Sequence, residues 1–161
     1  MNRGKFFSLT LSMVLMATVA LLPENRKAQE KPQYYVGITD PDRDGLQKGH
    51  GMNVEGKASI PLGEHLWVLV RRVDFEGFWW PQGEGKIDPN SLKWKVPVIF
   101  GQLKDVGWEF DITAITVNET EHIKLMNYRK NAMEKNIWSP IEMPPTTLPP
   151  QYRKVMKISD N

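Results

Sequence analysis

One stretch of the sequence, His65–Gly83, constrains the fold more than any other. From His65 to Val73 apolar side chains fill both sets of alternate positions, so a strand here would be apolar on both faces. Such a strand belongs in the middle of a sheet, with other layers covering each face. The next residues, Gly77–Gly83, place three aromatics before a proline and a glycine, which predicts a turn or a sheet edge. We therefore expect this segment to form both the core and an aromatic corner.

Short alternating apolar runs dominate the rest of the chain after residue 33. Turn residues separate these runs, as in Asp40–Gly45 and Asp88–Ser91. Pro97 lies on the polar side of its run, which favours an edge strand or a bulge. Strands and helices do not alternate, so an antiparallel β-sandwich is predicted. The expected strands lie at Tyr34–Ile38, Met52–Ile60, His65–Val73, Trp94–Phe100, Trp108–Ala114 and Val155–Ile158.

One helix is expected late in the chain. Asn118 can cap its first turn, with Glu121 three residues later, and the helix should end near Asn136. The segment Ser139–Pro150 holds five of the twelve prolines and is predicted to be extended and irregular. The apolar stripe of the helix is supplied by Leu125, Tyr128 and Ala132, with Met126 and Met133 beside them.

The N-terminal residues 1–22 are predicted to be a signal peptide or an N-terminal membrane anchor. Arg3 and Lys5 precede the uncharged, mostly apolar run Phe6–Leu22. Cleavage after Ala20 would leave a periplasmic or extracellular protein, whereas retention would tether the domain to the membrane by this segment alone. Residues 23–32 form a charged linker, and residues 33–161 form the domain.

Charge and composition exclude several functional classes. The chain has 21 Lys and Arg residues against 19 Asp and Glu, and Arg3 and Lys5 account for the whole excess, which argues against nucleic-acid binding. The absence of cysteine excludes disulfides and thiolate catalysis. His50, His65 and His122 do not have the spacing of a metal motif, and no Gly-x-Ser-x-Gly motif is present. The sequence therefore predicts no catalytic residues, metal or cofactor.

The aromatic corner is the candidate ligand-binding site, formed by Phe78, Trp79, Trp80 and Gln82. Planar aromatic rings can stack on a sugar or anchor a protein partner. The alternative is that these rings close the core, as large aromatics commonly do. Neighbouring residues of a strand face opposite ways, so one of Trp79 and Trp80 is expected to be buried and the other exposed.

The core strand also carries two consecutive arginines. One of Arg71 and Arg72 is expected to point inward or to lie along an edge, where it would need a carboxylate. Glu109 and Asp111 on the neighbouring predicted strand are the candidates. Surface ion pairing of little energetic weight is the alternative.

Five motifs are spread over the predicted domain: ITDP at 38–41, VEG at 54–56, HLWVLVR at 65–71, WPQG at 80–83 and GWEFDI at 107–112. Together they resemble an uncharacterised immunoglobulin-like module of bacterial secreted and membrane-attached proteins. The resemblance covers about residues 34–158 and implies the fold, but the family supplies no catalytic residues. The sequence thus predicts an exported, non-enzymatic module that contacts a protein or glycan at the cell envelope. A purely structural or accessory domain is the alternative, and a hydrolase is the third class considered.

Overall fold

The computed structural model describes residues 33–160. The predicted signal or anchor segment and the linker lie outside these residues. The described chain is mainly β with one α-helix, as predicted. Its elements are β1 (Tyr35–Asp40), β2 (Leu46–Lys48), β3 (Gly51–Ser59), β4 (Glu64–Arg72), β5 (Phe78–Glu84), β6 (Lys93–Ile99), the 3-10 turn η1 (Leu103–Asp105), β7 (Glu109–Asn118), α1 (Glu119–Lys135), β8 (Ile141–Glu142) and β9 (Gln151–Lys157).

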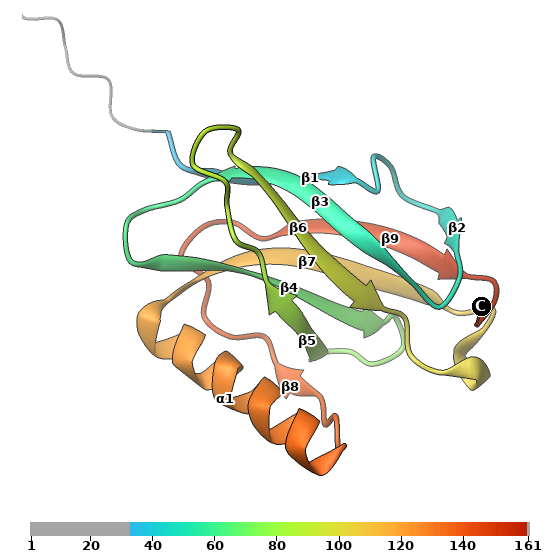
Figure 1. Ribbon diagram of the computed structural model, residues 1–161. Coiled ribbons are helices and arrows are strands. Elements are labelled where there is room, and N and C mark those ends of the chain that lie inside the picture. Colours follow the sequence, from blue (N-terminus) through green and yellow to red (C-terminus); the bar gives the residue numbers. More distant parts are fainter. Residues whose placement is uncertain (1–32, 161) are drawn as a thin grey trace, which may run out of the picture. The chain divides into compact units, whose positions relative to one another are not determined.

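The strands form two sheets. The smaller has the order β1-β3-β6 and the larger the order β2-β9-β7-β4-β5-β8 (Figure 1). All paired strands are antiparallel except β2 and β9, which run parallel. β2 had no counterpart among the predicted strands. β6 lies at an edge of the smaller sheet, which confirms the expectation drawn from Pro97.

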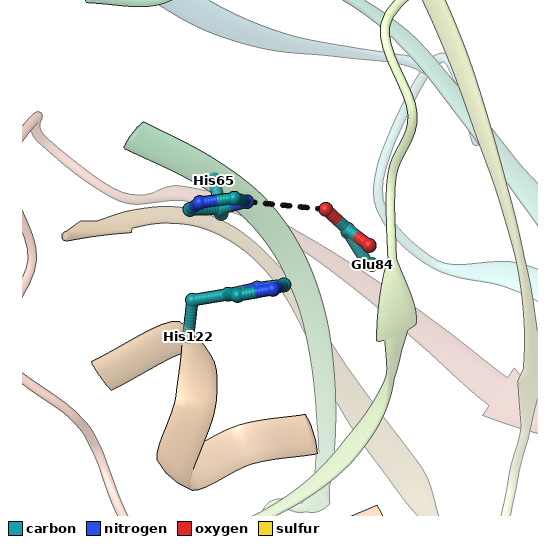
Figure 2. Close-up of side chains that lie close together, drawn as sticks. All are labelled: His65, Glu84 and His122. Carbon is teal, nitrogen blue, oxygen red and sulfur yellow. Dashed lines mark hydrogen bonds and ion pairs between the residues drawn. The ribbon is translucent and has the colours of Figure 1, made fainter. Parts of the chain in front are cut away.

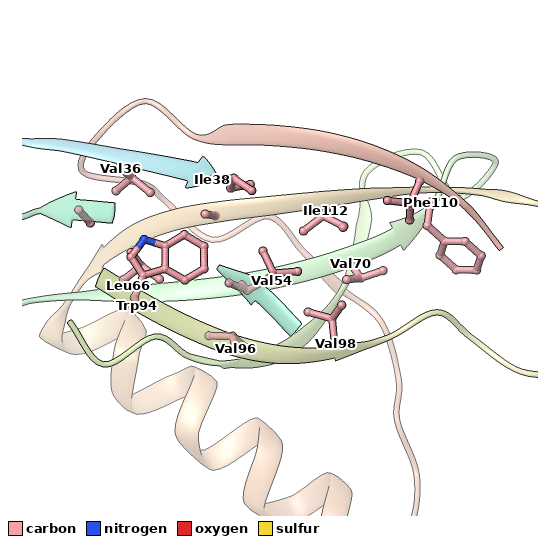
Figure 3. Close-up of a cluster of buried hydrophobic side chains, with 14 of the residues drawn as sticks. Val36, Ile38, Val54, Leu66, Val70, Trp94, Val96, Val98, Phe110 and Ile112 are labelled. Atoms are coloured by element: carbon pink, nitrogen blue, oxygen red, sulfur yellow. The ribbon is translucent and has the colours of Figure 1, made fainter. Parts of the chain in front are cut away.

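The main core lies between the two sheets (Figure 3). Val36 and Ile38 from β1 meet Leu66, Val68 and Val70 from β4 in one buried cluster. The period-2 pattern of the sequence therefore identifies the inward faces correctly. The other buried members are Val54 and Ala58 of β3, Trp94, Val96 and Val98 of β6, Phe110, Ile112 and Ala114 of β7, Val155 of β9, and Phe100, which directly follows β6.

β4 is covered on both faces, as its sequence predicts. On the face away from the smaller sheet, Trp67 and Leu69 are fully buried. They pack in a second cluster with Leu125 of α1 and with Ile141. The helix thus acts as a third layer on part of the large sheet (Figure 1). No helix within residues 33–160 is long and apolar enough to cross a membrane.

The ends of α1 agree with the prediction. The Asn118 side chain accepts a hydrogen bond from the backbone N–H of Glu121 at 3.0 Å. The C-cap is Asn136, in the left-handed conformation at φ 51°. Of the predicted stripe, Leu125 and Ala132 are buried, but Met126 and Met133 beside them are exposed. The contact with the sheet is therefore narrower than the apolar composition of the helix suggested.

The segment Gly77–Gly83, predicted to be a turn or a sheet edge, is mostly a strand, and after Trp79 this strand lies at the edge of the sheet. β5 begins at Phe78, and the turn that joins it to β4 lies at residues 73–77. The strand is irregular beside its proline. Leu69 pairs with Pro81 and Val68 pairs with Gly83, so Gln82 is the extra residue of a bulge. β8 pairs only with the first two residues of β5, so the missing N–H of Pro81 interrupts no ladder on that side.

The strand predicted from Trp108 to Ala114 also needs a correction. β7 begins at Glu109, and Trp108 lies before it with 41% of its surface exposed. Thr113, expected on the wet face, is fully buried, and its hydroxyl donates to the Gln151 carbonyl at 3.1 Å. Ile115 continues this face into the cluster beneath α1. The outer face of β7 is therefore polar only in its first part.

Candidate functional site

The aromatic corner divides between the core and the surface. Trp79 is 3% exposed and packs with Trp67 in the cluster beneath α1. Its ring also lies 4.6 Å from the guanidinium carbon of Arg71. Phe78 is 46% exposed, and Trp80 is half-buried. Adjacent residues thus take opposite faces, as expected, and a ligand at this corner would reach Phe78 and Trp80 rather than Trp79.

Gln82 connects the two sheets. Its amide nitrogen donates to the Trp80 carbonyl at 3.1 Å, and its amide oxygen accepts from the Ile99 N–H at 2.9 Å. Ile99 belongs to β6 of the smaller sheet, and Gln82 to the bulge of β5. Both ends of the amide are therefore occupied within the protein, which favours a positioning role for Gln82.

A second group of aromatics extends the corner beyond the predicted residues. The guanidinium carbon of Arg72 lies 4.7 Å from the ring centre of Phe75 and 4.5 Å from that of Trp108. Phe75 in turn meets Trp80 edge-on, with ring centres 5.4 Å apart. We call Trp108, Arg72, Phe75 and Trp80 the aromatic-arginine ladder. It combines residues from β4, β5, the turn between them and the approach to β7.

Two carboxylates fix the arginine of the ladder. Asp74 accepts two bonds from Arg72, at 2.6 and 2.8 Å, and Asp105 accepts a third at 2.5 Å. The hydrogen bond with Asp74 is the largest cause that raises the pKa of Arg72, and the same bond lowers the pKa of Asp74. Asp105 is buried and also accepts from the Gln102 N–H at 2.7 Å. The ladder therefore has a fixed cation between two partly exposed rings.

A separate polar cluster lies where α1 begins. His65 of β4 and His122 of α1 stack with ring centres 3.7 Å apart and an angle of 14° between their planes (Figure 2). His65 contacts Glu84 through Nδ1 at 3.2 Å and Glu119 through Nε2 at 2.7 Å. Trp67 donates from its indole N–H to Nδ1 of His122 at 3.1 Å. The fold thus brings together two histidines that the sequence analysis treated as isolated.

This cluster has the residue types of a metal site but not the geometry of one. Ligand atoms of His65, Glu84 and His122 lie within 4.8 Å of one another. An indole N–H can only donate, so Nδ1 of His122 is an acceptor and the proton of the neutral ring is on Nε2. The nearly parallel rings also keep their in-plane lone pairs from converging on one ion. We therefore interpret the cluster as a hydrogen-bonded contact between helix and sheet.

The carboxylate predicted for the core-strand arginines is present. Arg71 donates from Nε to Asp111 at 2.9 Å, and the two residues are directly opposite in the β4–β7 pair. Arg72 uses Asp74 and Asp105 instead. Neither carboxylate could be assigned from strand alternation, because both belong to turns.

Comparison with known proteins adds no assignment. No family model matches the chain, and no curated protein matches it. The functional argument therefore rests on the surfaces and contacts described above.

Proposed function

We propose that this protein is an exported, non-enzymatic, immunoglobulin-like module that binds a protein partner at the cell envelope. The observation that carries the proposal is the aromatic-arginine ladder, in which Arg72 lies between two rings that each remain about two-fifths exposed. Large aromatic and arginine side chains are the residues that dominate protein interfaces. Phe78, exposed beside Trp80 on the same strand, enlarges this surface.

The ladder favours a protein over a glycan. Stacking on a sugar needs an open ring face, whereas Arg72 covers one face of Phe75 and one face of Trp108. One face of each ring is therefore closed to a sugar, and beside the rings lie a fixed cation and the Asp74 carboxylate, which is still 37% exposed. Such a mixed surface suits the side chains and backbone of another protein. Glycan binding is the alternative to be distinguished.

The proposal of an exported module rests on the sequence of residues 1–22, where a basic start precedes an apolar run. The immunoglobulin-like assignment rests on the motif resemblance, to which the two-layer β architecture adds support. A non-enzymatic role is supported by the hydrogen bonds of the three histidines, which go to Asp160, Glu84, Glu119 and Trp67 and leave none paired with a hydroxyl nucleophile among residues 33–160.

The test is site-specific photo-crosslinking of the full chain in the cells that produce it. A photoreactive phenylalanine analogue at Phe78 is expected to give one discrete protein adduct, and the same analogue at Leu62, fully exposed in the β3–β4 turn, is expected to give none. The Phe75→Ala variant should lose the adduct. Tyr35→Ala is the matched control, because Tyr35 and Phe75 are both aromatic and 39% exposed. An adduct that survives Phe75→Ala, or glycan binding without a protein adduct, would refute the proposed partner.

A further inference from the structure

The stacked histidines join the first turn of α1 to the start of β4, and the contacts of each ring fix its protonation. His65 contacts a carboxylate through each nitrogen, so both nitrogens carry a proton when both bonds are made. Nδ1 of His122 accepts from Trp67 and so carries no proton. The geometry therefore holds a charged His65 stacked on a neutral His122, an arrangement that a ring–cation attraction favours.

From this geometry we propose that the pair is a proton-sensitive clasp. It holds the first turn of α1 on the sheet while His65 is charged and His122 is neutral. It releases that turn when His122 is protonated as well. The clasp is independent of the aromatic-arginine ladder.

The second proton cannot be accommodated in the docked arrangement. On His122 it must be added to Nδ1, where it would oppose the indole N–H of Trp67 across 3.1 Å. Trp67 is 0% exposed, so its N–H has no access to water as an alternative partner. Two charged rings would also be stacked at 3.7 Å. The docked helix thus binds fewer protons at His122 than the released helix, and a fall in pH favours release.

The charged groups around the pair do not remove this conflict. Glu84 from β5 and Glu119 from α1 contact His65 and so favour its charge. Glu84 lies within 4.8 Å of His122 as well, but an attraction at that distance leaves two donors facing each other at Nδ1. Two further carboxylates, next to His65 and His122 in the sequence, have other partners. Glu64 of β4 accepts from the Thr147 hydroxyl, and Glu121 pairs with Lys124 at 2.7 Å.

Loss of the first proton weakens the clasp by a different route. A neutral His65 carries a proton on only one nitrogen, so it can donate to Glu84 or to Glu119 but not to both. One carboxylate would then face a ring lone pair. Docking of the first turn should therefore be strongest at intermediate pH and weaker on both sides. On the acid side, release uncovers Trp67, which lies in the cluster beneath α1.

The test is an NMR titration of the full chain from about pH 8 to about pH 5, where histidines exchange their proton. The readouts are the ring signals of His65 and His122, the indole N–H signal of Trp67, and the exchange protection of the amides of residues 121–125, corrected for intrinsic rates. Where the released His122 carries the second proton and the docked His122 does not, the ratio of released to docked turn should rise about tenfold for each unit by which the pH falls. The loss of protection and the shift of the Trp67 signal should follow the same curve.

Two variants separate the clasp from a general effect of acid. His122→Gln should abolish the acid response of residues 121–125. His50→Gln should retain it, because His50, the third histidine of the chain, pairs with Asp160. The proposal is overturned if His122 becomes charged in the wild type while Trp67 and the amides stay unchanged, or if His122→Gln keeps the acid response. The wild-type titration decides the matter even if His122→Gln does not fold.

Discussion

At the scale of single residues, packing between β3 and its neighbours leaves no room at Gly56. A Cβ there would lie 2.0 Å from the Gly37 carbonyl oxygen and 2.3 Å from the ring of Trp94. At Gly37, by contrast, the nearest atom to an added Cβ would be 3.6 Å away, an ordinary contact. Trp94 is 2% exposed, so its ring cannot move toward solvent without opening the core.

Gly56→Ala is therefore expected to destabilise the protein by about 3 kcal/mol or more, the cost of forcing atoms into a packed core. Gly37→Ala is its control and should change the free energy of unfolding by less than about 1 kcal/mol. Urea unfolding of the two variants measures both quantities. A loss for Gly56→Ala as small as that expected for Gly37→Ala would show that the approach of β1 and β6 to Gly56 is looser than described.

The histidine cluster shows which residue-level contacts could be predicted from sequence. The sequence suggested that one of the two arginines would pair with Asp111 or Glu109, and the structure pairs Arg71 with Asp111, which is opposite it in β4 and β7. That pairing alone sets a register that places His65 opposite Val117, next to the start of α1. His122 could have been placed near His65 by this step. The stacking itself depends on side-chain rotamers and on Trp67, which no sequence pattern specifies.

At the scale of elements, the period of the apolar residues predicted β4 and the cap residue Asn118 predicted the start of α1, whereas β5 was predicted only in part. In β4 both faces are apolar and the strand is central, so the pattern and the packing agree. In β5 the proline and glycine suggested a turn or a sheet edge, and the segment is a strand that lies at the edge after Trp79. The strand also has a bulge at Gln82, and a bulge depends on the partner strand rather than on the local sequence.

Substitutions at the two caps of α1 are expected to change the stability of the protein in different directions. Asn118→Ala removes the side-chain acceptor of the Glu121 N–H and should cost about 1 kcal/mol. Asn136→Gly relieves a left-handed conformation at φ 51° and should be neutral or slightly stabilising, by at most about 1 kcal/mol. Thermal unfolding of both variants in the same buffer measures the difference. Equal destabilisation by both changes would contradict the assigned cap roles.

At the scale of the whole molecule, the C-terminal end is fastened by a buried lysine. Lys157 is 0% exposed, and its ammonium donates to the Gln102 carbonyl at 2.7 Å and to Asp160. The bond from Lys157 is the main cause that lowers the pKa of Asp160, and the bond from His50 adds to it. A lowered carboxylate pKa contributes stability that is present above its ordinary value and is lost as the pH falls through the lowered one.

The unfolding temperature should therefore fall as the pH decreases below about 4. Asp160→Asn should lower the unfolding temperature at pH 7, because it leaves the buried Lys157 without its carboxylate, and should lose less on further acidification. Asp42→Asn, an exposed carboxylate 4.0 Å from Arg43, is the control and should behave like the wild type. Calorimetry over this pH range provides the comparison. An Asp160→Asn protein as stable as the wild type at pH 7 would contradict the role of this pair.

At the scale of the whole molecule, two neighbouring tryptophans lie on opposite sides of β5, Trp79 in the buried cluster beneath α1 and Trp80 in the partly exposed aromatic-arginine ladder. The most direct measurement is urea unfolding of Trp79→Ala and Trp80→Ala. Trp79→Ala should cost about 3–5 kcal/mol, because it leaves a cavity in the cluster beneath α1. Trp80→Ala should cost only about 1–2 kcal/mol, for the edge contact with Phe75 and the bond to the Trp138 carbonyl at 3.0 Å. Equal costs, or a larger cost for Trp80→Ala, would show that Trp80 belongs to the core and not to a binding surface.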